Sequence, residues 1–143
     1  MTDETTELLD YEALRRARGE LGAAFVRILG YFREDGAKSV GEVEDAMRRQ
    51  DAAAMVIPAH TLKGEAHQFG AEPLALLAEI IEEGARRCVE TRVEPDELLQ
   101  EVVKLRPLFR QTLALLEREA NPLAERRPAF GRKAQVTQAI GGY

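Results

Sequence analysis

Apolar residues recur every three or four positions along most of this chain, which is the period of an amphipathic helix. A short first helix takes its apolar residues from Leu8 to Leu14, and the region around Gly19 and Gly22 interrupts it. A second helix takes its apolar residues from Leu21 to Phe32, and Gly36 marks its predicted end. No segment reads as a strand, so every predicted element is helical.

The stretch after Gly36 allows two interpretations. Ser39 is a good N-cap, and Glu42 follows three residues later in the capping-box position. The apolar residues Val40, Val43 and Met47 then share one face. Either a separate third helix begins near Ser39, or the stretch continues the second helix.

The residues that typically start or end helices predict three more helices in the rest of the chain. One runs from about Asp51 to Phe69, with Gly70 just past its end. The next begins at Glu72 and Pro73, because proline is favourable at the first helical position. The last begins at the sequence EPDE, residues 94–97, and carries its apolar stripe as far as residue 115.

Two prolines lie inside these predicted helices. Pro58 and Pro107 each remove a backbone hydrogen bond and clash with the preceding turn. We expect a kinked or locally broken helix at Pro58, because the apolar pattern continues on both sides of it. The alternative is a helix that begins at Pro58.

The connections between these helices are short, so consecutive helices should pack antiparallel. The predicted fold is all-α: an up-down antiparallel four-helix bundle with a short N-terminal helix. We assign this bundle to residues 1–120. Residues 121–143 lose the periodicity and gain Pro and Gly, which predicts a mobile or loosely docked C-terminal tail.

Charge and composition exclude several classes of protein. The 143 residues carry a formal net charge of -5, which divides into -8 for residues 1–120 and +3 for the tail. An acidic domain of this kind is a poor match for nucleic acid. Cys88 is the single cysteine, which excludes an internal disulfide and a cysteine-based metal site. With no signal-peptide pattern at the N-terminus and no apolar run of about 20 residues, we expect a soluble cytoplasmic protein away from membranes.

Both histidines of the chain lie in the helix predicted for residues 51–69. At about 100° per residue, one stripe of this helix is apolar and should be buried. A second stripe, centred about 120° from the first, should face water and present His60. The apolar stripe contains Met55, Ala59, Leu62, Ala66 and Phe69, and the second stripe contains Val56, His60, Lys63, Gly64 and His67.

Two neighbours of His60, Lys63 and Gly64, suggest that its imidazole is a reactive and accessible group. Lys63 lies one turn along the same face and places a cation near the imidazole without hydrogen-bonding it as a carboxylate would. That cation disfavours the protonated ring and would stabilise an anion carried by it. Gly64 costs about 1 kcal/mol in an exposed helix relative to Ala. Its missing Cβ leaves room for another protein's active site, although Gly22, Gly30 and Gly84 show that helices of this chain tolerate glycine.

His67 lies two turns beyond His60 on the same stripe. It can be a second nucleophile, a partner contact or an ordinary surface residue. We do not expect a zinc site formed by the two histidines, because two turns separate them by about 10 Å along the axis. We therefore predict no metal site.

The segment HTLKGEAHQFGA, from His60 to Ala71, resembles the signature of histidine-containing phosphotransfer (HPt) domains. The resemblance covers roughly Leu21 to Arg87. It implies a four-helix bundle whose exposed histidine accepts a phosphoryl group from the aspartate of one receiver domain and passes it to another. His60 matches the phosphorylated position, Lys63 and Gly64 match supporting positions, and Gly70 matches the helix-ending glycine.

Other residues near the signature bear on this resemblance. Many HPt domains have a small residue in place of Glu65, but Glu65 points away from the His60 stripe. Arg86 and Arg87, on the next helix, are candidates to approach the phosphate. The partner should dock on an apolar patch beside His60. The residues predicted to bind the partner are Val56, Ile57, His67 and Gln68.

The predicted role is that of a phosphocarrier rather than an enzyme. The chain has no glycine-rich phosphate loop, so it should have no ATP site and no cofactor of its own. Mg²⁺ is expected on the partner, a receiver domain of a response regulator or hybrid histidine kinase. We expect a monomer. One alternative is a non-catalytic helical module that binds receivers, and another is the dimerisation piece of a sensor kinase, whose usual acidic residue after the histidine is here Thr61.

Overall fold

The computed structural model describes residues 7–120, and this part of the chain is helical without strands, as predicted. The short helix α1 (Tyr11–Leu21) leads through a 3₁₀ turn into the long helix α2 (Phe25–Arg48). Helices α3 (Ala52–Gln68) and α4 (Glu72–Thr91) follow, and a second 3₁₀ turn precedes α5 (Leu99–Ala120). The predicted tail, residues 121–143, lies outside the described residues.

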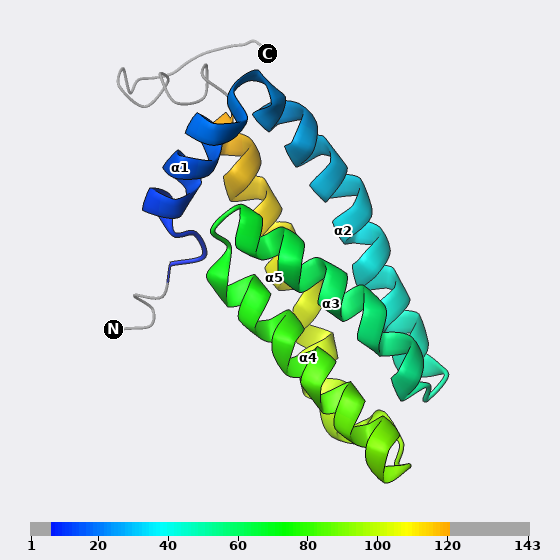
Figure 1. Ribbon diagram of the computed structural model, residues 1–143. Helices are drawn as coiled ribbons and strands as arrows, with labels where there is room; N and C mark the ends of the chain where they lie inside the picture. The colour runs from blue at the N-terminus through cyan, green and yellow to red at the C-terminus, as the bar shows by residue number, and fades with distance from the viewer. Residues whose placement is uncertain (1–6, 121–143) are drawn as a thin grey trace, which may run out of the picture.

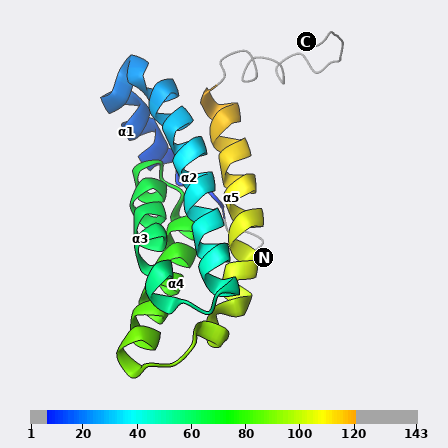
Figure 2. The same cartoon turned by 90° about the vertical axis from the view of Figure 1, so that its right-hand side faces the viewer.

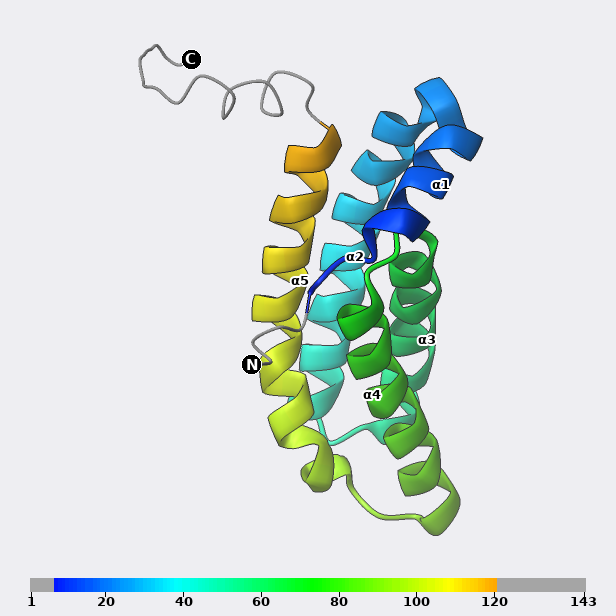
Figure 3. The same cartoon turned by 90° about the vertical axis from the view of Figure 1, so that its left-hand side faces the viewer.

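Helices α2 to α5 form a four-sided bundle (Figure 1). Each of these helices packs against two others, so that α3 and α5 lie on either side of the α2–α4 diagonal. Successive helices run in opposite directions along the bundle, and α1 lies at the end where α2 begins and α3 ends (Figures 1 and 3). Viewed from the side, α2 and α5 run next to each other over most of the bundle's length (Figure 2).

The predicted apolar stripes form the core. All five residues predicted to be buried in the histidine-bearing helix are fully buried, from Met55 to Phe69. The ring of Phe69 contacts Phe32 in a tilted arrangement and Phe25 edge-to-face, with ring centroids 5.3 and 5.7 Å apart respectively. Phe32 also meets Phe109 of α5 at 5.5 Å. These aromatic contacts connect three helices near one end of the bundle.

Helix α2 shows that the predicted helix end at Gly36 is wrong, and that the stretch after Gly36 continues the second helix rather than forming a third. Gly36 does not end a helix, because α2 is continuous from Phe25 to Arg48 and Ser39 is a buried interior residue rather than an N-cap. Gly36 is required by packing: a Cβ at this position would lie 2.5 Å from Cε1 of Phe109. The glycine therefore allows α5 to approach α2 closely.

The boundaries of α3 agree with those predicted, from about Asp51 to Phe69. The side chain of Asp51 caps the helix by accepting a hydrogen bond from the Ala54 amide, and the helix runs through Pro58 without starting there. Gly70 adopts φ +72°, a left-handed conformation that favours glycine. Its carbonyl accepts a hydrogen bond of 2.7 Å from the Asp10 amide, so the turn after α3 is attached to the start of α1.

Helix α4 begins at Glu72 with Pro73 in its first turn, as predicted. The last helix begins slightly later than expected, because Pro95–Leu98 form a 3₁₀ turn before α5. Within residues 7–120, no helix is both long and apolar enough to cross a membrane.

Candidate functional site

His60 is exposed on the outer face of α3, as the helical periodicity predicts. Its side chain retains 61% of its accessible surface. The residues about one turn before and one turn after His60 differ in bulk. Ile57, three positions earlier, is 75% exposed, whereas a Cβ added to Gly64, four positions later, would meet no atom within 4 Å. The ring is therefore reachable from solvent, with an apolar side chain before it and open space after it.

The imidazole has a carboxylate partner that the sequence analysis missed. Nδ1 of His60 lies 3.0 Å from Oε2 of Glu82, which projects from α4 and is only 5% exposed. The sequence analysis placed only the cation of Lys63 beside the ring, and the structure adds this carboxylate. No residue between 7 and 120 forms a hydrogen bond with Nε2, the other ring nitrogen.

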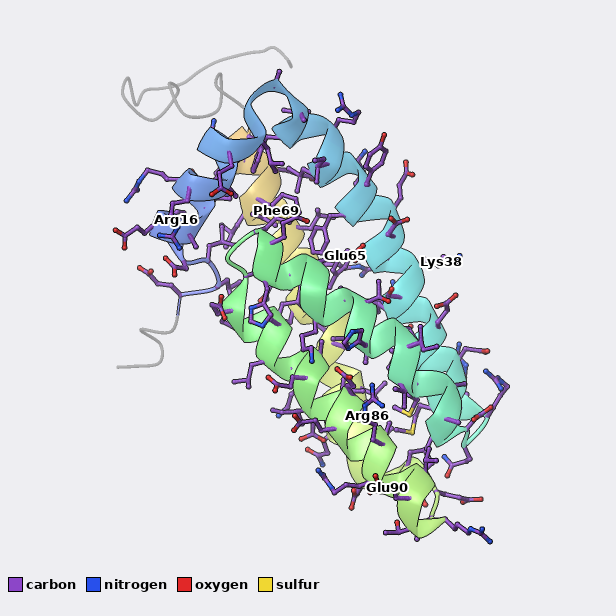
Figure 4. All side chains as sticks on the ribbon, viewed as in Figure 1. Arg16, Lys38, Glu65, Phe69, Arg86 and Glu90 are labelled. Atoms are coloured by element: carbon purple, nitrogen blue, oxygen red, sulfur yellow. The ribbon has the colours of Figure 1, made fainter. Side chains whose placement is uncertain are left out.

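Glu82 also binds two cations. Nζ of Lys63 lies 3.0 Å from Oε1, which makes a close ion pair. Arg86 donates from Nη2 and Nε to Oε2 at 2.9 and 3.3 Å. Figure 4 shows Arg86 on α4, alongside α3. We call His60, Lys63, Glu82 and Arg86 the Glu82 cluster.

The charge state of Glu82 follows from these contacts. Burial by itself would raise the pKa of the carboxyl group, because it penalises the ionised form. The hydrogen bonds from Arg86, Lys63 and His60 outweigh this effect and lower the pKa to about 2. Glu82 is therefore an ionised acceptor across the physiological range, and His60 Nδ1 must donate the proton of their hydrogen bond.

Small side chains bring the two helices of the cluster together. Ala59 and Ala66 of α3, and Ala78 and Ala85 of α4, are fully buried. Helix α3 packs more extensively on α4 than any other two helices pack on each other. Ala78 and Ala85 lie one turn before and one turn after Glu82. This close packing places a carboxylate of α4 within reach of a side chain on the outer face of α3.

Two of the other candidate residues are placed differently from His60. His67 is 52% exposed, and its Nδ1 lies 3.4 Å from Oε1 of Glu72, a carboxylate that is itself 54% exposed. Arg87 is exposed on α4 and contributes no contact to the Glu82 cluster, unlike Arg86. His67 thus has a carboxylate neighbour but lacks the buried setting and the two cations of His60.

The remaining predicted contact residues surround His60 on α3. Ile57 and Gln68 are exposed, whereas Val56 is partly buried against the core. Glu65 faces α2 rather than the histidine (Figure 4), in agreement with the predicted angle. Among the described residues, no group of three or more His, Cys, Asp or Glu side chains could hold a metal ion.

An apolar groove of about 580 Å³ lies elsewhere, between α4 and α5. Leu76 and Ile80 line one wall, and Val103 and Pro107 line the other. Lys104 is its single titratable lining residue. The groove therefore lacks a cluster of titratable side chains that could take part in a reaction, and the Glu82 cluster remains the candidate site.

The comparisons with known proteins agree with this fold. A family model described as the Hpt domain matches residues 27–122. A similar solved structure is that of histidine-containing phosphotransfer protein B (HptB) from Pseudomonas aeruginosa PAO1, with a TM-score of 0.70, 23% identity, and coverage of 80% of this chain and 96% of that chain. At this identity the likeness shows a shared fold. No curated protein sequence matches. Because the family model matches more than half of the chain, the protein belongs to the Hpt domain family.

Proposed function

We propose that this protein is a histidine phosphotransfer protein that carries a phosphoryl group on Nε2 of His60 between the aspartates of receiver domains. The observation that supports this proposal best is the state of the His60 ring. Its Nδ1 is bound to a buried carboxylate, while the ring remains 61% exposed. Nε2 is thus the nitrogen that a visiting active site can reach.

Phosphoryl transfer depends mainly on positioning and on neutralising charge. Glu82 fixes the orientation of the ring through Nδ1, and the cluster brings two cations, Lys63 and Arg86, close to it. With a neutral imidazole the cluster has a net charge of +1, which favours the approach of an anionic phosphoryl group. The partner receiver would supply its own acidic pocket and Mg²⁺. The chain acts as a phosphocarrier without an ATP site of its own.

The receiver would dock over the exposed face of α3. Ile57 offers the most exposed large apolar side chain of the described residues, three positions before the histidine. Gly64 leaves room for the partner's active-site loops on the other side of the ring. Val56, His67 and Gln68 complete the proposed contact surface, and the protein would bind its receivers as a monomer.

Labelling with a phosphorylated receiver domain tests the function. We expect acid-labile phosphate to transfer to the wild-type chain, to be absent from His60→Gln, and to persist in His67→Gln. His67→Gln is the matched control, because it removes the other exposed histidine of the same helix face. Label that depends on His67 would contradict the proposal. Binding of the receiver without any label would instead identify a non-catalytic interaction module.

A further inference from the structure

We propose that residues 126–133, a segment of the predicted tail, bind in the apolar groove between α4 and α5, with the ring of Phe130 seated between the two helices. This proposal is independent of the proposed function, because the groove and Glu82 lie on different faces of α4. The segment would cover apolar side chains that the described helices leave exposed.

The groove exposes apolar side chains that a folded protein normally covers. Leu76 and Ile80 of α4 and Val103 of α5 line it and are 57, 44 and 64% exposed. The lining that the structure describes is apolar apart from Lys104 and Gln111. Among the four neighbouring helix pairs of the bundle, α4 and α5, which both face the viewer in Figure 3, pack least extensively. A continuous apolar surface of this kind is typical of a binding site.

A row of acidic residues runs along α4 beside the groove. Glu72 lies four positions before Leu76, and Glu79 and Glu83 lie three and seven positions after it, which places all three on the same side of the helix as Leu76. Glu72 and Glu83 are exposed, and Glu79 is partly exposed. The occupant that fits this surface has an apolar centre flanked by positive charges.

Residues 126–133 have this composition. Their sequence, RRPAFGRK, carries four cations and no acidic residue, with Phe130 between the two pairs of cations. An aromatic ring buries a large apolar area and commonly anchors an interface. Residues 1–6, which also lie outside the described part of the chain, read MTDETT and would bring two more acidic residues to the acidic row. The basic segment is therefore the better match.

The length of the chain allows this segment to reach the groove. Helix α5 forms one wall and ends at Ala120, at the end of the bundle that carries α1 (Figure 3). Val103, at the far end of the groove, lies 17 residues before Ala120, which is about 26 Å along the helix axis. The ten residues from Ala120 to Phe130 can span up to about 33 Å. Asn121 and Pro122, directly after α5, are typical of a chain that turns away from a helix.

The covalent connection also favours this occupant over a second molecule. A segment of the same chain has an effective concentration on the order of millimolar at a site within its reach. A second copy or a separate partner would have to reach a similar concentration in free solution to compete with it.

NMR of the full chain with labelled methyl groups tests the proposal. We expect nuclear Overhauser contacts, in a dilute sample, from the ring protons of Phe130 to the methyl groups that line the groove. These methyl groups belong to Leu76, Ile80 and Val103. Phe130→Ser should change their chemical shifts, because it removes the ring current of the seated ring. Tyr143→Ser is the matched control: it removes an aromatic ring outside residues 126–133 and should leave these shifts unchanged.

Three results would overturn the inference. The first is the absence of contacts between Phe130 and every groove methyl group of the wild-type chain, which decides the question even if a variant does not fold. The second is contacts that form only between differently labelled molecules in a mixed sample, which would assign the groove to a second copy. The third is a shift change caused by Tyr143→Ser and not by Phe130→Ser. None of these measurements uses phosphorylation, so they leave the proposed function untouched.

Discussion

Two carboxylates with a buried oxygen lie on the two sides of α3, Glu82 of α4 on one side and Glu65 of α3 itself on the other. Their surroundings shift the pKa values of the two groups in opposite directions. On the α4 side, three donors lower the pKa of Glu82 to about 2 although burial opposes them. On the α2 side, burial raises the pKa of Glu65 to about 6, and the negative charge of Asp35 adds to the increase. Burial alone therefore does not decide whether a carboxylate of this bundle is ionised.

The difference lies in the partners. Oε1 of Glu65 is buried and has no hydrogen-bond partner within the described residues. Glu82 instead accepts from an imidazole and a guanidinium and pairs with an ammonium. A buried charge is tolerated only when such groups compensate its lost hydration. Glu82, whose charge is compensated in this way, lies on the same side of α3 as His60, the candidate phosphoacceptor.

The largest effect should come from removing the charge of Glu82. Its pKa is lowered from 4.5 in the unfolded chain, and a shift of this size corresponds to about 3 kcal/mol of stability. A carboxyl group with a lowered pKa stabilises the fold above its unfolded pKa, and the contribution disappears as the pH falls toward 2. We expect Glu82→Gln to lower the unfolding free energy by up to about 3 kcal/mol at pH 7.

Denaturant unfolding at a series of pH values measures this effect. The difference between wild type and Glu82→Gln should narrow from pH 4.5 downward, because the wild type loses the contribution of its ionised carboxylate. Glu83→Gln is the control for a loss of negative charge at an exposed position. A constant difference across the whole acid range would mean that Glu82 stabilises the bundle by packing rather than by charge.

Most of the fold could be predicted from the sequence, because helix termini and apolar stripes are local features. Asp51, Gly70 and Pro73 each mark a helix boundary through the conformation or hydrogen bond of that residue alone. Gly36 shows where such reasoning fails. A glycine that ends a helix and one that admits a ring from another helix look alike in sequence, and here Phe109, 73 positions later, decides between them.

The candidate site was predictable only in part for the same reason. The periodicity of α3 places His60, Lys63 and Gly64 on one exposed face without reference to the rest of the chain. Glu82 lies 22 residues from His60, and its contact depends on how closely α3 and α4 pack. One signal was present: Glu82 lies between Ala78 and Ala85 on the buried side of its helix, where a carboxylate needs a partner.

A smaller effect of opposite sign is expected for Glu65. A carboxyl group with a raised pKa weakens the fold at pH values above that pKa, because the folded state must ionise it in an unfavourable place. We expect Glu65→Gln to stabilise the protein at pH 8 by about 1 kcal/mol, after allowance for the partial exposure of the side chain. The gain should vanish near pH 4, where the carboxyl group is protonated in both states.

Thermal unfolding at pH 8 and pH 4 tests this prediction. Asp35→Asn should produce a fraction of the same gain, because the charge of Asp35 is the lesser of the two causes that raise the pKa of Glu65. Equal effects of Glu65→Gln at both pH values would show that the pKa of Glu65 is the same in the folded and the unfolded chain. The contrast between the two sides of α3 would then rest on Glu82 alone.

The smallest change in stability is expected at Gly64, on the exposed face between the two carboxylates. A Cβ at this position meets no atom within 4 Å, so Gly64→Ala should stabilise α3 by about 0.5–1 kcal/mol through helix propensity. The same methyl group would occupy space that a docked receiver needs. We expect transfer from a phosphorylated receiver to slow by up to about tenfold, the equivalent of about 1.4 kcal/mol of lost docking energy.

Two comparisons separate the effect of Gly64→Ala on docking from its effect on the helix. Labelling by phosphoramidate should be unchanged, because this donor is too small to contact the added methyl group while it reacts at the ring. Gly30→Ala should give a similar gain in stability without slowing transfer, because a Cβ at this position in α2 would lie 3.8 Å from the flexible end of the Arg33 side chain. If Gly64→Ala stabilises the protein and leaves receiver-dependent transfer at the wild-type rate, the open space beside His60 is not part of the docking surface.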